Sequence, residues 1–322
     1  MKLIKYALPV LAAVCASALV FSSGAKAQNY PNKQIELIVP YSAGGGTDLV
    51  ARAFADVAKN HSPQPFGVVN KTGGAGAIGL SEISKARPNG YKIGIGTVEL
   101  TMLPHMGMAS FTADEFTPIA RLNAEPSAIS VLAESPWQTY EEFIEYAKAN
   151  PGKVRIGNSG TGAIWHIAAA ALGERTGAQF NHVPYDGANP AVTALLGGHI
   201  EAVTVSPPEV IAHVKAGKIR ILAVMSEERQ QLFPDVPTLK EKGVDLSVAT
   251  WRGIAGPKGL PEDIQKVLRD ISKKTAEDPA FKEALAKMNA TWAYLDGPEY
   301  KAVIDKDNAF FKEIMTKLGI AK

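Results

Sequence analysis

The chain has 322 residues, and its 34 lysines and arginines nearly balance its 32 aspartates and glutamates. This balance, together with the lack of a basic stripe in the sequence, excludes nucleic acid as an expected partner. Cys15 is the only cysteine, and the six histidines show neither an H-E-x-x-H motif nor another paired spacing, so no metal site or other cofactor is expected.

The first 27 residues have the pattern of a signal peptide. Lys2 and Lys5 precede an apolar stretch over residues 7–21, and Ala25-Lys26-Ala27 follows as a small-x-small cleavage pattern. An apolar stretch of about 15 residues is short for a membrane span, so we expect cleavage before Gln28 rather than a membrane anchor.

Cleavage would remove three lysines and no acid, so 34 basic residues fall to 31 against 32 acidic ones. We expect this near-neutral mature chain to be a soluble periplasmic protein that does not itself span the membrane. Lipoprotein anchoring at Cys15 is not expected, because Val14 fits poorly before a lipidated cysteine.

Short β-rich runs alternate with helical patterns along most of the chain, which indicates βα units on mainly parallel sheets. The first series has expected strands over 35–39, 66–69, 91–96 and 119–122, and helices over 47–60 and 77–86. The second series has expected strands over 129–132, 154–157, 180–183, 200–205 and 219–225, and helices over 140–149, 164–176, 190–196 and 208–216. Residues 226–248 are expected to form a connection, and two or three helices follow from residue 261.

The two series predict an α/β protein with two lobes, each a mainly parallel sheet flanked by helices, and a ligand cleft between them. We place the C-terminal helices on the first lobe, so lobe 1 is expected to comprise residues 28–125 and 247–322, and lobe 2 residues 126–246. Ligands of open α/β sheets bind beyond the carboxyl ends of the strands, so the strand-to-helix loops of both lobes should line this cleft.

The loop over residues 42–48 lies between an expected strand and an expected helix, where backbone amides and the helix dipole create an anion site. It lacks the Gly-Lys-Ser/Thr of a P-loop. Asp48 would repel a phosphate dianion, but it suits a helix cap or a partner for a ligand's hydroxyl or ammonium group. The alternative is a tight turn with Thr47 or Asp48 as the N-cap.

Residues 74–79 form a literal G-x-G-x-x-G after an expected strand, and Glu99 lies 20 residues after Gly79. This pattern is the dinucleotide fingerprint, but the export signal and the polar spacer 70–72 argue against it. The alternative is a glycine-rich turn that lets a helix pack closely.

Residues 157–162, Gly-Asn-Ser-Gly-Thr-Gly, supply hydroxyl and amide groups at a similar junction in the second lobe. They are not a nucleophile elbow, since Thr161 stands where G-x-S-x-G requires its second glycine. His166 follows on the next expected helix, which leaves open a secreted serine hydrolase using Ser159 and His166. The alternative for His166 and Trp165 is a place in the core or the cleft wall.

A third loop, over residues 183–187, follows another expected strand of the second lobe. Its Tyr185 and Asp186 could face the cleft, and a plain turn is the alternative.

Eight motifs, spread in order over nearly all of the mature chain, resemble those of the tripartite tricarboxylate transporter substrate-binding proteins, also called Bug receptors. They are PNKQIELIVPYSAGGGTD from Pro31, VNKTGGAGAIG from Val69, RPNGY from Arg87, FTPIARL from Phe116, GNSGTG from Gly157, HVPYDG from His182, ALLGGHIEA from Ala194 and FPDVPT from Phe233.

The resemblance implies a type II periplasmic solute-binding protein and not an enzyme. Such a receptor would capture a small carboxylate, which is a di- or tricarboxylate, an acidic amino acid or an aromatic acid, and deliver it to the membrane permease subunits of the transporter. The family commonly holds a carboxylate through backbone amides and ordered water instead of an arginine. Its binding loops match residues 41–48 and 158–162 here.

We expect a monomer in which one ligand carboxylate lies against residues 42–48 and the loop over 158–162 closes over it. The expected ligand-binding residues are Tyr41, Ser42, Gly44, Gly45, Gly46, Thr47, Asp48, Asn158, Ser159, Thr161, Gly162, Ala163, Tyr185 and Asp186.

The sequence departs from the commoner family pattern at residues 41–43 and 98–100, which leaves open what holds the distal end of the ligand. Glu99 in the cleft would disfavour a second carboxylate unless solvent or a cation intervened. Trp251, Tyr185 and Trp165 could wall a pocket, or serve as hinge or core aromatics.

Overall fold

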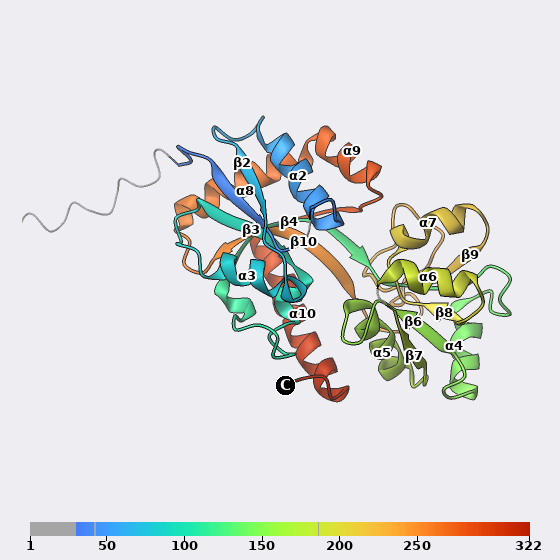
Figure 1. Ribbon diagram of the computed structural model, residues 1–322. Coiled ribbons are helices and arrows are strands. Elements are labelled where there is room, and N and C mark those ends of the chain that lie inside the picture. Colours follow the sequence, from blue (N-terminus) through green and yellow to red (C-terminus); the bar gives the residue numbers. More distant parts are fainter. Residues whose placement is uncertain (1–29, 42, 186) are drawn as a thin grey trace, which may run out of the picture.

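The computed structural model describes residues 30–41, 43–185 and 187–322, so the expected signal peptide, Cys15, Ser42 and Asp186 lie outside the described residues. Figure 1 shows two lobes, each built around its own β-sheet, with the N-terminal and C-terminal parts of the chain sharing one lobe. The two-lobed α/β class is confirmed.

The first lobe contains a six-stranded sheet in the order β11-β4-β10-β3-β1-β2. Its strands are β1 (Ile35–Val39), β2 (Phe66–Asn70), β3 (Lys92–Thr97), β4 (Phe116–Pro126), β10 (Ala249–Pro257) and β11 (Trp292–Asp296). Strand β1 runs parallel to β2 and β3, whereas β10 runs antiparallel to both β3 and β4.

Helices cover both faces of this sheet, which is why β1 is almost continuously apolar. Phe54, Leu268 and Phe281 of three helices pack with Leu37 on one face. On the other face Ile38 packs in a core with Leu80 and Tyr300. The helices are α2 (Gly46–Ala58), α3 (Ala77–Ser84), α8 (Glu262–Glu277), α9 (Pro279–Lys287) and α10 (Gly297–Lys317), with short 3-10 turns η1 (Gly74–Gly76), η2 (Val98–Thr101) and η3 (Ala113–Glu115).

The second lobe contains a five-stranded sheet in the order β7-β6-β8-β5-β9. Its strands are β5 (Ala128–Leu132), β6 (Arg155–Asn158), β7 (Asn181–Pro184), β8 (Ala202–Val203) and β9 (Ile219–Val224). Its helices are α4 (Tyr140–Ala149), α5 (Ile164–Thr176), α6 (Ala188–Leu196) and α7 (Pro207–Lys215). Local signals set their limits, because α4 begins at a Thr139–Glu142 capping box and α5 ends at Gly177 in the left-handed conformation.

Both sheets are mixed rather than mainly parallel, because β10 and β5 run antiparallel to their neighbours. The sequence reasoning missed β10 and β11. Glycines are depleted in strands, but β10 requires them: a Cβ on Gly253 would lie 2.5 Å from the Ala120 carbonyl oxygen and 2.7 Å from the Tyr300 ring.

The chain crosses between the lobes beside Ser127 and Val248. The amide of Ser127 donates to the carbonyl of Val248 at 2.8 Å, and the amide of Met225 donates to the carbonyl of Ser127 at 2.8 Å. The first of these hydrogen bonds ties the two crossing segments together, and the second ties the crossing at Ser127 to the second lobe.

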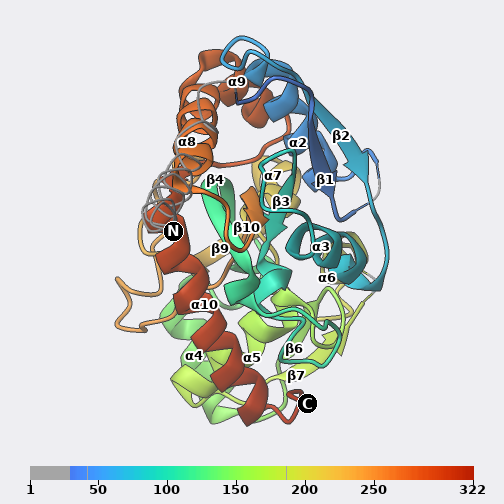
Figure 2. The same ribbon diagram turned by 90° about the vertical axis from the view of Figure 1, so that its left-hand side faces the viewer.

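The three C-terminal helices pack on the first lobe, and α10 also reaches the second lobe (Figure 2). Lys306 and Lys317 of α10 form ion pairs with Glu227 and Glu174 of the second lobe, both on exposed surface. Among residues 30–322, none of the described helices combines the length and apolarity needed to cross a bilayer.

Gly79 offers a test of the close packing of α3. A Cβ there would lie 2.6 Å from Pro40 Cα and 2.7 Å from the Lys71 carbonyl oxygen, so the glycine-rich segment lets the helix approach the sheet. We predict that Gly79→Ala lowers the free energy of unfolding by about 1–3 kcal/mol, although alanine favours helices. Gly46→Ala is the control, since its Cβ would meet nothing closer than Arg252 Nη2 at 3.5 Å. Equal urea-unfolding curves for the two variants would contradict the packing argument.

Candidate ligand-binding cleft

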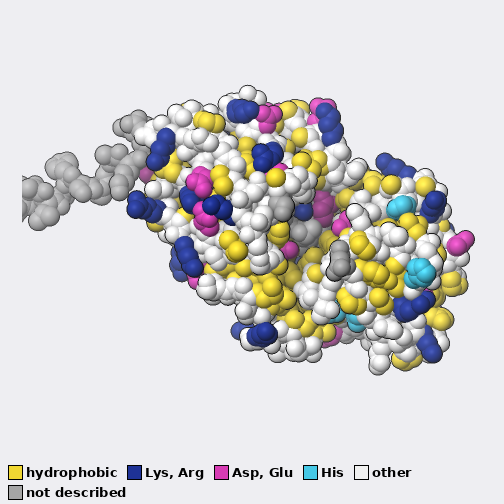
Figure 3. Space-filling view, viewed as in Figure 1, with side chains coloured by type: hydrophobic (Ala, Val, Ile, Leu, Met, Phe, Trp, Pro, Cys, Tyr) yellow, Lys and Arg dark blue, Asp and Glu magenta, His cyan; other side chains and the backbone are white. Residues whose placement is uncertain are grey.

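The candidate site lies where the carboxyl ends of β1 and β3 and the start of β10 meet at one edge of the first sheet. Arg252 on β10 is the register partner of Thr97 at the end of β3, and α2 begins seven residues after Val39 ends β1. Figure 3 shows a hollow between the two lobes, with acidic and basic side chains gathered at its floor. The hollow therefore combines strand ends, a helix N-terminus and fixed charges.

The N-terminus of α2 presents bare backbone to this hollow. Gly44, Gly45 and Gly46 are exposed, and Gly45 is the N-cap with no side-chain capping bond. The N-cap is thus neither Thr47 nor Asp48, contrary to the alternative of a side-chain-capped turn. First-turn amides without a cap can bind an anion.

Asp48 is buried and holds the loop in place through hydrogen bonds. Its carboxylate accepts hydrogen bonds of 2.8 Å from the Gly44 amide, from Arg52 Nε and from Asn70 Nδ2. Burial alone would raise the pKa of Asp48, but the bonds from Arg52, Gly44 and Asn70 together hold it below its usual value. Asp48 therefore fixes the shape of the loop, and its carboxylate oxygens are already used in these three hydrogen bonds.

Arg252 is the residue that sequence reasoning missed. Its Nε donates to Thr47 Oγ1 at 3.0 Å, and its Nη2 lies 3.5 Å from where a Cβ on Gly46 would stand. A half-buried guanidinium thus adjoins the N-terminus of α2. The available signal was a single charge inside the otherwise uncharged run 249–257, where a buried charge is costly unless it has a partner.

Tyr41, Thr97 and Glu99 form the neighbouring part of the floor. The Tyr41 hydroxyl lies 3.4 Å from Thr97 Oγ1 and 3.4 Å from the Ala75 carbonyl oxygen. Burial first, and then the Glu99 carboxylate, raise the pKa of Tyr41, so its hydroxyl stays protonated. Glu99 is half-buried at the start of η2.

The two second-lobe loops lie side by side, because Asn158 and Pro184 are register partners at the ends of β6 and β7. Asn158 is fully buried, its Oδ1 accepts from the Gly160 amide at 3.0 Å, and its Nδ2 has no partner among the described residues. A Cβ on Gly162 would lie 2.9 Å from Met106 Cε of the first lobe, so this loop lies at the junction of the lobes.

A hollow of about 440 Å³ opens at these loops and is lined by Gly160, Thr161, Pro184, Tyr185 and Pro190. The structure thus brings together the expected residues of each lobe that it describes. These are Tyr41, Gly44, Gly45, Gly46, Thr47 and Asp48 in the first lobe, and Asn158, Ser159, Thr161, Gly162, Ala163 and Tyr185 in the second.

Two further acids near Arg252 are occupied by structural hydrogen bonds. Glu125 accepts from the Thr291 amide at 2.6 Å and from its hydroxyl at 3.0 Å, while Glu209 accepts from the Ser206 amide and hydroxyl in a capping box. Burial raises the pKa of both acids, whereas Arg252 favours their charged forms.

His166 is committed to the fold rather than to Ser159. Its Nδ1 accepts from the Gly162 amide at 3.0 Å, and its ring packs edge-on against His182 at 5.0 Å. Burial lowers the pKa of His166, and no hydrogen bond joins it to Ser159 in the described part of the chain. The geometry thus gives the hydrolase alternative no nucleophile–base pair.

Trp251 and Trp165 are core residues. Trp251 is 1% exposed, donates from Nε1 to Asp307 at 2.7 Å and packs edge-on against Tyr300. Trp165 is also buried, and its carbonyl accepts from Thr204 Oγ1 at 2.8 Å.

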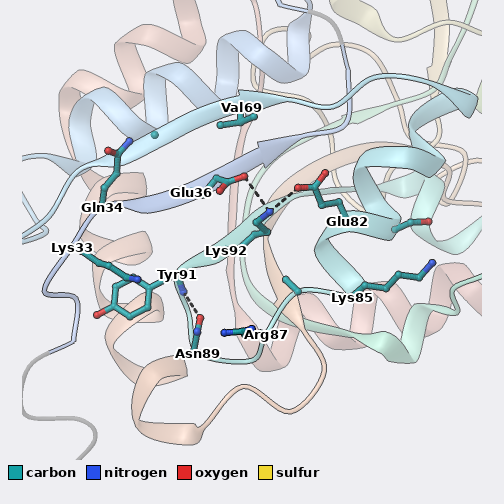
Figure 4. Close-up of a pocket in the computed structure, with 13 residues that line it drawn as sticks. Lys33, Gln34, Glu36, Val69, Glu82, Lys85, Arg87, Asn89, Tyr91 and Lys92 are labelled. Carbon is teal, nitrogen blue, oxygen red and sulfur yellow. Dashed lines mark hydrogen bonds and ion pairs between the residues drawn. The ribbon is translucent and has the colours of Figure 1, made fainter.

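A larger cavity, of about 910 Å³, lies on the first lobe at the opposite, amino-terminal end of β1 and β3 (Figure 4). Lys92 in its wall forms ion pairs with Glu36 at 3.4 Å and with Glu82 at 2.7 Å. This groove is remote from the helix N-termini, and its central charges neutralise one another. Within the described ranges, no group of three or more His, Cys, Asp or Glu side chains could hold a metal ion.

Two α/β lobes with strand-to-helix loops facing a shared hollow define the class of periplasmic solute-binding proteins. The family model described as tripartite tricarboxylate transporter family receptor, TctC, matches residues 50–320. The chain therefore belongs to this family. Its receptors are periplasmic, bind small carboxylates and work with tripartite tricarboxylate transporters, and they are not enzymes.

Individual relatives cover most of the chain. A TctC solute-binding protein from Polaromonas, solved without ligand, is 48% identical with a TM-score of 0.86, over 89% of this chain and 99% of that one. The UPF0065 protein in the gbd 5' region of Cupriavidus necator is 34% identical over 92% of this chain and 91% of its own. An R. palustris protein solved with adipate is 26% identical with a TM-score of 0.72, over 91% and 99% of the chains.

We predict that Asp48→Asn destabilises the protein at pH 7 by about 2–3 kcal/mol, because the amide cannot accept from all three donors. The pKa of Asp48 is lower in the folded protein than in the unfolded chain, where it is near 4. The ionised carboxylate therefore stabilises the fold fully above about pH 4, and this stabilisation is lost as the pH falls through the folded pKa. The difference between wild type and variant should therefore shrink below pH 4 in urea titrations. Asp56→Asn, on the exposed face of the same helix, is the control, and a variant at position 48 as stable as this control would refute the role.

Proposed function

We propose that this protein is a periplasmic receptor that captures a small carboxylate in the interlobe hollow and delivers it to a tripartite tricarboxylate transporter permease. The observation that carries the proposal is the pairing of the uncapped α2 N-terminus with the Arg252 guanidinium. Both favour an anion at the same point, one through amide dipoles and the other through a full charge.

Arg252 makes this first-lobe site stronger than amides alone. It forms no salt bridge with any described acid, although it influences the pKa values of Glu125 and Glu209. We infer that a ligand carboxylate bound at Gly45 and Gly46 accepts hydrogen bonds from the first-turn amides and from Arg252.

The second lobe supplies the other half of the site. The buried Asn158 Nδ2 lacks a partner in the described chain, and an unmade buried hydrogen bond is costly. We infer that the ligand accepts this bond when the lobes close, and that Ser159, Thr161 and Tyr185 line the closed site. Ser42 and Asp186 remain candidate contacts.

Closure would move residues 28–125 with 247–322 as one unit against residues 126–246, about the hinge at Ser127 and Val248. Each half-site alone binds weakly, so a ligand that contacts both shifts the equilibrium toward the closed state. One chain carries both half-sites, so a monomer suffices. Export follows the expected signal over residues 1–27, and the permease would recognise the closed state.

Adipate in the R. palustris relative supports a carboxylate as the ligand, because that protein shares the fold over nearly its whole length. A thermal-shift screen of mono-, di- and tricarboxylates tests the proposal directly, since a ligand of the folded state raises the melting temperature. A chain that no carboxylate stabilises would not be such a receptor.

We predict that Gly45→Val abolishes this stabilisation without unfolding the protein. Gly45 has φ −74° and ψ 164°, which any residue can adopt, so the added side chain does not strain the backbone and should occupy the space of the carboxylate. The unliganded variant should remain folded and lose about 0.5–2 kcal/mol of stability, because valine is a poorer N-cap residue than glycine. Unchanged ligand affinity in this variant would contradict the assigned anion site.

We predict that Arg252→Gln weakens carboxylate binding by about 10- to 100-fold, the effect of losing a hydrogen bond to a charged group. Arg87→Gln serves as the control, because Arg87 lies in the remote groove of Figure 4. Calorimetric titration with the best acid of the screen measures both variants. Equal losses in the two variants, or none in either, would remove Arg252 from the site.

A further inference from the structure

We propose that Glu99 gives the site a negative pole, so that the ligand is an acid with a single carboxylate and an ammonium or other donor group at its distal end. The inference rests on the proposed function and adds selection against dicarboxylates. It depends on three features of the first-lobe floor. These are the position of Glu99, the charged side chains that form no salt bridge, and the acids that already accept hydrogen bonds from the protein.

Glu99 lies beside the positive pole. Arg252 is the register partner of Thr97, and Glu99 follows Thr97 by two residues as β3 turns into η2. The Tyr41 hydroxyl contacts Thr97 at 3.4 Å and is held protonated beside the Glu99 carboxylate, which raises its pKa after burial. The floor thus presents the Arg252 cation and the Glu99 anion at the same end of the paired strands β3 and β10.

The two poles do not neutralise each other. Within the described chain, neither Glu99 nor Arg252 takes part in a salt bridge, although 19 such contacts occur elsewhere. Both side chains are half-buried, and half-buried charges are costly to leave without partners. A ligand with opposite charges at its two ends would satisfy both.

The other acids near the floor are already used. Glu125 is held by Thr291 and Asn123, Glu209 by Ser206, and Asp48 by Gly44, Arg52 and Asn70. This leaves Glu99 as the acid of the floor whose carboxylate adjoins a neutral hydroxyl, that of Tyr41, and which takes part in no salt bridge among the described residues. A second ligand carboxylate near Glu99 would be repelled, whereas an ammonium group would be attracted.

Matched acids that differ only at the distal end test the inference. The pairs are succinate with 3-aminopropanoate, glutarate with 4-aminobutanoate, and adipate with 5-aminopentanoate, each titrated calorimetrically. At the best-fitting length, wild type should bind the amino acid at least tenfold more tightly than the dicarboxylate. Glu99→Gln should lose at least tenfold for the amino acid and gain for the dicarboxylate.

Glu36→Gln is the matched control, because Glu36 belongs to the same lobe but pairs with Lys92 in the remote groove. This variant should keep the wild-type preference, and both variants should melt close to wild type without ligand. The acids that stabilise wild type in the broader screen are titrated in the same way.

The outcomes separate this inference from the function on which it rests. Dicarboxylates that bind wild type as tightly as amino acids do, with no gain in Glu99→Gln, would overturn the role of Glu99 while leaving carboxylate capture intact. A wild type that no acid of either set stabilises would overturn the proposed function, and the inference with it.

Discussion

The placement of β10 in the middle of the first sheet is the constraint on which the site depends. After leaving the second lobe beside Val248, the chain enters between β3 and β4 and runs antiparallel to both. This path makes β10 part of both the core and the candidate site: Trp251 packs on Tyr300, Gly253 lets Tyr300 approach the strand, and Arg252 reaches Thr47. A shift of the register by one residue would turn Arg252 to the opposite face of the sheet.

The acidic residues in and around the cleft fall into two groups, according to the groups that their carboxylate oxygens contact. Asp48, Glu125 and Glu209 accept bonds from nearby amides and side chains, and so fix a loop, a strand end and a helix start. Their burial is tolerable because each carboxylate is hydrogen-bonded. Glu99 differs because its described polar neighbour is the Tyr41 hydroxyl rather than a backbone amide or a cation, so proximity to the cleft alone does not make an acid a ligand contact.

The local sequence pattern was sufficient to predict most helices and strands, but it could not predict which distant segments pair in the sheets. Helices such as 140–149 and 164–176 have the predicted limits, because capping and glycine signals lie in the chain itself. The sequence singled out the glycine loop 44–46 for its amides, and the structure places these glycines on the surface. Arg252 was missed because its position depends on pairing with Thr97, far away in the sequence, and because the glycines of β10 hide the strand pattern.

Charge balance decides what such a cleft can enclose. Backbone amides complement a carboxylate with dipoles alone, so lobe closure over them buries one net negative charge. Arg252 offsets that charge, and with Glu99 present the site is two positive charges short of neutrality for a dicarboxylate. Closure on a dipolar ligand instead pairs every charge, and desolvation costs least when no unpaired charge is enclosed. Glu99 would thereby act through the same electrostatics that the glycine loop uses.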